Sequence, residues 1–153
     1  MVDAQQVRRW LEREGISVDV VEDSKTRWHF AVNYPGKDGL LTHILCPADR
    51  DHLVRIIRAV EVSDEHRRVI GALSPQEFRV FRFNLVRDLL LHGEVEFVID
   101  ADEEARRITR ILVVRVLREE GLSPEALFTA LRVVHDAMIL IILHVRMTAN
   151  ESL

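Results

Sequence analysis

Two histidines in the N-terminal third have the residue type and spacing that could bind a metal ion. His29 and His43 lie in the alternating segments 27–34 ("RWHFAVNY") and 40–46 ("LLTHILC"), which flank the turn sequence "PGKDG". If the segments pair as a hairpin, both imidazoles lie diagonally on one face, close enough to approach one ion. The alternative, which we favour, is two ordinary polar residues on the wetter face of a sheet. A third ligand would have to come from Asp49, Asp51 or His52.

The remaining chain lacks the common catalytic signatures. It contains no phosphate loop, dinucleotide glycine fingerprint, zinc ribbon, "HExxH" or "GxSxG". His135 and His144 are half a turn out of phase on one helix, so they cannot share a site. The strand alternation places Cys46 on the inward face, where we expect its thiol to be buried and unreactive. We predict a protein that is not an enzyme and has no metal, cofactor or catalytic residues. The runner-up is a small metal- or ligand-binding enzyme that uses the histidines and carboxylates of the hairpin face.

The densest basic cluster is Arg106, Arg107 and Arg110, which could meet a phosphate or an acidic partner. The neighbouring acids can neutralise it, and the net charge of −4 with a pI near 6.0 disfavours nucleic acid. We therefore favour the interpretation that these arginines are solvated and pair with neighbouring acids. The acids in question are Asp100, Asp102, Glu103 and Glu104. The aromatic residues Trp28, Phe30 and Tyr34 share a face with Ile44 and are predicted to be core rather than a stacking platform for bases.

Composition bounds the class of protein. The 153 residues are 48% hydrophobic and 30% charged, which suits one compact domain over 1–153. Cys46 is the only cysteine, so an intrachain disulfide is impossible, and the N-terminus lacks a signal-like apolar core. We expect a cytoplasmic protein. Lys25 and Lys37 are the only lysines beside many arginines, a bias that indicates a high-GC genome and is compatible with a thermophile.

Periodicity predicts the order of elements. The predicted elements are a helix over 3–15, strands over 16–20, 27–34, 40–46 and 52–62, helices from Ser63 and from Ser74 to about His92, strands over 94–100 and 106–117, and a helix from Ser123 to about Met147. A helix over 102–118 is the alternative to the last strand. The order α-β-β-β-β-α-α-β-β-α predicts a two-layer α+β fold. Its antiparallel sheet has five to six strands with helices on one face.

This order, the strand "EVEFVID" and the segments 59–90 and 111–134 resemble the class I chaperones of type III secretion. They resemble more closely an uncharacterised archaeal family of unknown function with the same fold. The resemblance spans nearly the whole chain and is one of elements, not of a catalytic motif. In the secretion chaperones the fold dimerises and holds an extended partner chain along its surface. The resemblance thus implies a protein-binding or chaperone-like module with a protein or peptide partner, whose identity it does not carry over.

The last helix changes character halfway. Thr129, Arg132 and Asp136 form a narrow polar sector that should face solvent, but further along the helix this sector becomes apolar. Charged residues and histidines interrupt the apolar run, so a membrane span is disfavoured. These apolar side chains must be covered by protein, either by the same chain, for example by 78–91, or by a second copy. We favour the second copy and therefore predict a homodimer. The predicted interface residues are Ile139, Leu140, Leu143 and Met147.

Overall fold

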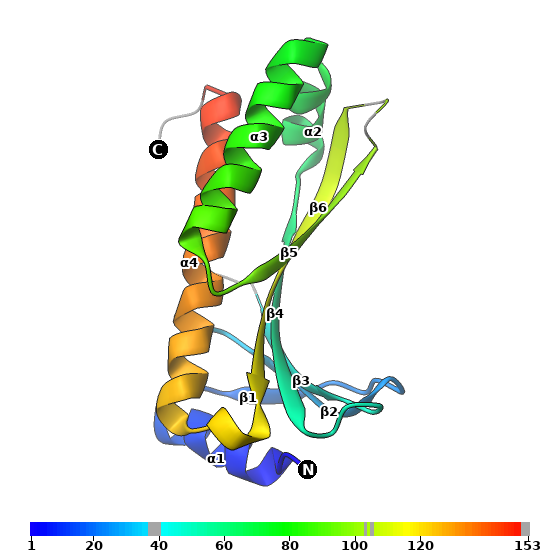
Figure 1. Cartoon of the computed structure of the whole chain (residues 1–153). Helices are drawn as coiled ribbons and strands as arrows, with labels where there is room; N and C mark the ends of the chain where they lie inside the picture. The colour runs from blue at the N-terminus through cyan, green and yellow to red at the C-terminus, as the bar shows by residue number, and fades with distance from the viewer. Residues whose placement is uncertain (37–40, 103, 105, 151–153) are drawn as a thin grey trace. The chain divides into compact units, whose positions relative to one another are not determined.

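The computed structural model describes residues 1–36, 41–102, 104 and 106–150 (Figure 1). The elements follow the predicted order. They are α1 (Ala4–Arg13), β1 (Val18–Val20), β2 (Thr26–Val32), β3 (Thr42–Pro47), β4 (Leu53–Glu61), α2 (Asp64–Gly71), α3 (Pro75–His92), β5 (Glu96–Asp102), β6 (Arg107–Arg118), a single 3-10 turn η1 (Glu119–Gly121) and α4 (Pro124–Thr148). An antiparallel six-stranded sheet and four α-helices among these residues confirm the α+β class.

The chain divides into two compact units. Unit 1 comprises Met1–Arg58 and Val114–His135, and unit 2 comprises Ala59–Val113 and Asp136–Leu153. The boundaries fall inside β4, β6 and α4, so these three elements contribute residues to both units. Each unit is therefore described by its own contacts.

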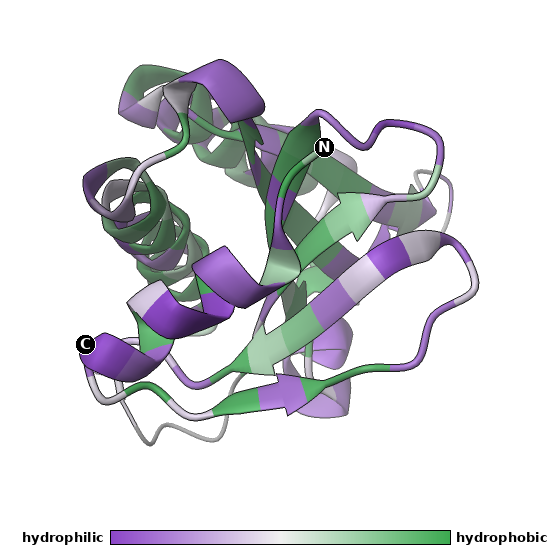
Figure 2. Cartoon of the chain, turned by 90° about the horizontal axis from the view of Figure 1, so that it is seen from below, coloured by the Kyte–Doolittle hydropathy of each residue, from purple (hydrophilic) through white to green (hydrophobic). Residues whose placement is uncertain are grey.

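The strand order is β1-β2-β3-β4-β6-β5. In the β2–β3 hairpin Phe30 pairs with Ile44 and Trp28 with Cys46, which confirms the predicted register. The expected pairing of Tyr34 with Leu40 lies outside the described residues. Hydrophobic and hydrophilic residues interchange along the strands (Figure 2), as expected where the two faces of a sheet differ in exposure.

One face of the unit 1 strands is core. Phe30, Ile44, Cys46 and Ile56 are at most 4% exposed, whereas alternate residues such as His43 are only partly buried. Helix α1 adds Val7 and Leu11 to this core, and its first turn is capped by the Asp3 carboxylate, which accepts from the Gln5 amide. Of the three aromatic residues predicted to be core, only Phe30 is buried; Trp28 and Tyr34 are partly buried, and the Trp28 indole donates to the Val2 carbonyl at 3.2 Å.

In unit 2 the helices begin where the sequence predicts. Ser63 caps α2, and Ser74 opens α3 with a capping box in which Ser74 and Glu77 each accept the other's backbone N–H. Helix α3 buries Phe78, Phe81, Leu85 and Leu89 on one side. Gly93 ends it at φ +68°, a conformation that glycine adopts without a steric penalty.

Residues 107–118 form a strand, so the predicted last strand is confirmed and the alternative helix over 102–118 is wrong. The segment forms a strand because its β-branched side chains pack well on the half-buried, pleated surface of a sheet. Arg106, the first residue of the segment predicted as a strand, lies just outside the strand at φ +50°. Arg110 pairs with Asp100 on β5 at 2.9 Å, which confirms local neutralisation. Glu103 is outside the described residues.

Candidate functional site

The two hairpin histidines of unit 1 come together as predicted. His29 Nε2 lies 2.8 Å from His43 Nδ1, a hydrogen bond in which one ring donates to the other. Asp23 Oδ2 lies 3.4 Å from the other nitrogen of His29. The expected third ligands are not part of this group, and Asp51 pairs with Arg27 at 3.5 Å. Among the described residues no three His, Cys, Asp or Glu side chains are placed to hold a metal ion.

The electrostatics of this pair disfavour a second positive charge. Burial lowers the pKa of His43 below its ordinary value, and the neighbouring His29 lowers it further. In this contact one ring donates its N–H to the bare nitrogen of the other, and protonation of both rings would place two cations against each other. We interpret the pair as a structural feature of the half-buried sheet face.

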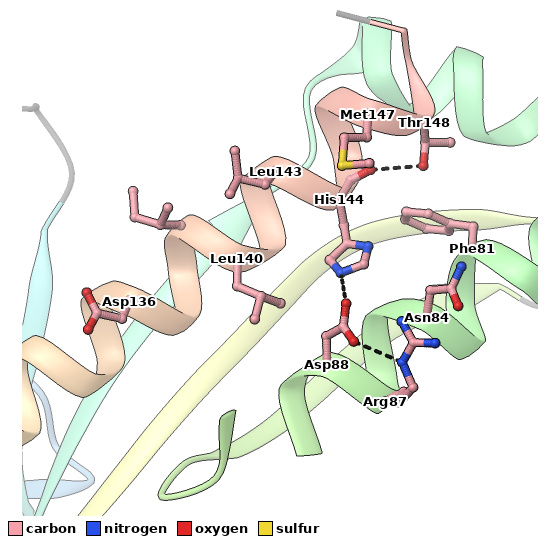
Figure 3. A pocket seen from close by; sticks show the side chains of 11 residues that line it. Phe81, Asn84, Arg87, Asp88, Asp136, Leu140, Leu143, His144, Met147 and Thr148 are labelled. Carbon is pink, nitrogen blue, oxygen red and sulfur yellow. Dashed lines mark hydrogen bonds and ion pairs between the residues drawn. The ribbon is translucent and has the colours of Figure 1, made fainter. Parts of the chain in front are cut away.

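A groove in unit 2 lies between α3 and the C-terminal half of α4 (Figure 3). It has a volume of about 690 Å³ and is open to solvent. All four predicted interface residues contribute to its walls. The lining residues are Phe81, Asn84, Arg87, Asp88, Asp136, Ile139, Leu140, Leu143, His144, Met147 and Thr148.

The outer sector of α4 changes from polar to apolar as the sequence predicts. Thr129, Arg132 and Asp136 are exposed on it. Beyond Asp136 the exposed side chains are apolar, and their exposed fractions are 40% for Ile139, 38% for Leu143 and 61% for Met147. In Figure 3, Leu140 points toward α3 while Leu143 points away from it. Within the described part of unit 2, the outer apolar side chains are thus only half covered.

A polar contact ties the two groove helices together. Asp88 Oδ2 accepts a hydrogen bond from His144 Nε2 at 2.8 Å, and Asp88 Oδ1 accepts from Arg87 Nε at 2.9 Å (Figure 3). The Arg87 guanidinium, and then His144, lower the pKa of Asp88. Thr148 donates to the His144 carbonyl rather than facing the ring. The Asp–His pair joins α3 to α4, and the lining around it contains no serine or cysteine.

The sequence reasoning missed two features of this site. The Asp88–His144 contact joins residues 56 apart in the chain, and no local pattern predicts such a pairing. The outer face of α3 was expected only as possible cover for α4, yet it exposes Val80, Phe83, Leu90 and Leu91. The sequence contained one signal for this exposed face, because apolar residues occupy both the inward and the outward positions of α3.

Helix α4 is also long and apolar enough to cross a membrane. It has 25 residues, and its most apolar window of 18 residues has a mean hydropathy of 2.0. However, 44% of that window is buried inside the protein, and the core helix of a soluble protein meets the same criterion. This feature is a weak indication of a membrane span.

The chain shares its fold with a chain of a chaperone–effector complex. It is similar to a chain of the HopA1-SchA complex at 13% identity and a TM-score of 0.51, covering 90% of this chain and 95% of that one. YbjN from E. coli is similar at 14% identity and a TM-score of 0.53, with coverages of 97% and 94%. The fold is therefore of the secretion-chaperone-like α+β class.

Within that class the chain belongs to DUF2299, an uncharacterised conserved protein family whose model matches residues 3–145. An uncharacterised protein from Methanothermobacter thermautotrophicus, known from its crystal structure, is similar at 29% identity and a TM-score of 0.86. The similarity covers 93% of this chain and 95% of that protein. No curated protein sequence matches the chain significantly. The resemblance to an uncharacterised family with a secretion-chaperone-like fold is thus confirmed.

Proposed function

We propose that this chain is a non-enzymatic, chaperone-like protein-binding module of the cytoplasm that works as a homodimer. The dimer contact is the apolar sector of α4 in unit 2, formed by Ile139, Leu140, Leu143 and Met147. A second copy supplies the cover that these side chains lack.

The observation that carries the proposal is the change of the exposed sector of α4 at Asp136. A helix on a sheet normally turns a polar stripe to water, and the first half of α4 does so through Thr129 and Arg132. The second half exposes Ile139, Leu143 and Met147 instead. An apolar patch with a polar border is the usual composition of a protein–protein interface.

The magnitude of this burial supports a contribution to assembly. Complete burial of an aliphatic side chain stabilises by roughly 1.5–3 kcal/mol, and these four are already about half covered, so their burial yields about 3–6 kcal/mol. A micromolar complex requires about 8 kcal/mol, so the interface must extend beyond the four side chains. Asp136, which borders the patch within unit 2, is placed to contribute at its polar rim.

The fold likeness supports protein binding rather than catalysis. The HopA1-SchA complex is a chaperone–effector complex, and a chain in it shares this architecture. The sequence adds no motif for nucleotide, metal or nucleophilic chemistry. We assign the partner of this module to the class of proteins or peptides.

Light scattering at micromolar concentration tests the proposal. The wild-type protein should have twice the 17.7 kDa mass of the chain. Leu143→Arg should give a folded monomer because it places a charge in the apolar contact. Thr129→Arg, an exposed position on the same sector of α4, is the matched control and should remain dimeric. Circular dichroism checks that both variants fold. A monomeric wild type, or a dimer that persists in folded Leu143→Arg, would reject the proposed interface.

A further inference from the structure

Helix α3 carries a second exposed surface in unit 2. Its buried side chains lie on one side, and the opposite side exposes Val80 at 53%, Phe83 at 65%, Leu90 at 67% and Leu91 at 78%. These fractions exceed those of Ile139 and Leu143 on α4. We call these four residues the α3 stripe.

The spacing of the α3 stripe fits a helix that binds along α3. Phe83 follows Val80 by about one helical turn, and Leu90 and Leu91 follow Val80 by about three turns, which places all four along one face. Such a row of anchors is the pattern by which proteins bind the apolar face of an amphipathic helix. The stripe faces away from the buried Phe78, Leu85 and Leu89, so the core of unit 2 does not cover it.

The charge along the stripe is mostly positive. The exposed charged side chains of α3 are Glu77 in its first turn and the arginines Arg79, Arg82 and Arg87, and Asp88 is partly exposed beside Arg87. Arg79 and Arg82, one turn apart, follow one edge, and within the described part of the chain Arg79 has no ion-pair partner. Arg87 lies 6.0 Å from the centre of the Phe83 ring and pairs with Asp88.

We propose that the α3 stripe docks an acidic amphipathic helix of a partner protein. The apolar anchors of that helix would cover Phe83 and Leu90, and its carboxylates would pair with Arg79 along the edge. This inference rests on the proposed protein-binding function and names the chemistry of the partner.

A protein partner fits this surface better than an anionic lipid surface or a second copy. An anionic membrane would extend beyond α3 and meet the rest of a chain whose net charge is −4, whereas a single partner helix contacts the locally basic α3 alone. Within unit 2 the apolar sector of α4 has both Asp136 and Arg146 beside it, so it does not offer a uniformly acidic edge to α3 of another copy. An acidic partner helix satisfies both the apolar and the charged part of the stripe.

Binding of synthetic helices tests the inference by fluorescence anisotropy. One labelled peptide carries leucine at i, i+3, i+4 and i+7 with glutamate on both flanks, and its matched peptide carries lysine in place of glutamate. The glutamate peptide should bind the wild-type protein. Phe83→Asn with Leu90→Asn should weaken binding at least about tenfold, since a tenfold loss corresponds to about 1.4 kcal/mol. Val98→Asn, which changes an exposed apolar residue of β5, should leave it unchanged.

A charge exchange completes the test. Arg79→Glu should weaken the glutamate peptide and strengthen the lysine peptide. Equal binding of both peptides to the wild type, or no effect of the Phe83 and Leu90 changes, would overturn the inference. Binding of phosphatidylglycerol vesicles through Phe83 and Leu90, without peptide binding, would overturn it in favour of lipid. Loss of the dimer in the Phe83 and Leu90 variant would overturn it in favour of a second copy, whereas a retained dimer without peptide binding would reject this inference alone.

Discussion

At the scale of single residues, Arg58 buries a guanidinium at an inward position of β4. It is 1% exposed, and its Nη1 donates to the Tyr34 carbonyl at 2.8 Å and to the Thr42 hydroxyl at 3.2 Å. Removing one partner of a buried charged contact leaves the other groups without hydrogen bonds. This arginine therefore holds the chain around Tyr34 and Thr42 against β4.

Arg58→Met is expected to lower the free energy of unfolding by about 2–4 kcal/mol, because it leaves buried acceptors unpaired. Arg55→Met lies on the opposite face of β4, is partly exposed, and should change the stability by less than about 0.5 kcal/mol. Urea unfolding of both variants measures the difference. Equal losses in the two proteins would mean that the contacts of Arg58 contribute nothing specific.

The hairpin histidines make stability depend on pH. Burial, and then His29, lower the pKa of His43 from 6.5, so the unfolded chain binds a proton more readily than the folded one. The stabilising effect is fully present above pH 6.5 and is lost as the pH falls below it.

The urea midpoint of the wild type should therefore drop between pH 7 and pH 5, a window set by linkage at about the histidine pKa. His43→Gln should reduce this drop, and His52→Gln, an exposed histidine of the same unit, should not. A pH dependence that is the same in all three proteins would contradict the assigned role of His43.

Residue-level prediction succeeded where the two residues share a local register. His29 and His43 could be placed on one face because a hairpin fixes the diagonal neighbours of adjacent strands. Asp88 and His144 could not be paired in this way, since their contact depends on how two distant helices pack. The burial of Arg58 and its two acceptors were likewise not predicted, because an arginine at an inward strand position is rarely buried without partners that only the fold supplies.

At the scale of elements, the capping box determines where α3 begins. The Ser74 hydroxyl accepts from the Glu77 amide at 3.2 Å, and the Glu77 carboxylate accepts from the Ser74 amide at 2.8 Å. Ser74→Ala is expected to cost about 1 kcal/mol of stability, because helical amides lose an acceptor. Gln76→Ala in the same exposed first turn should be nearly neutral. Thermal unfolding compares them, and a Ser74→Ala protein as stable as the control would rule out a stabilising cap.

Element prediction followed from periodicity and capping. The strand at 107–118 was the hardest to assign because its alternation resembles a helical period, and pairing in the sheet decides it. The change from polar to apolar residues along the outer sector of α4 was predictable because it depends only on helical geometry. The exposed α3 stripe was not, since the number of apolar residues in a helix does not reveal which of its faces the fold covers.

At the scale of the whole molecule, the account rests on an apolar sector of α4 that one chain leaves half exposed. Cysteine replacement in a Cys46→Ala background measures the proposed contact most directly. In a two-fold dimer, at least one of Ile139, Leu140, Leu143 and Met147 should form an intermolecular disulfide when replaced by cysteine, because that bond requires Cα atoms about 5–6 Å apart. Thr129→Cys should not form one. No covalent dimer at any of the four positions, or equal cross-linking at position 129, would contradict the account.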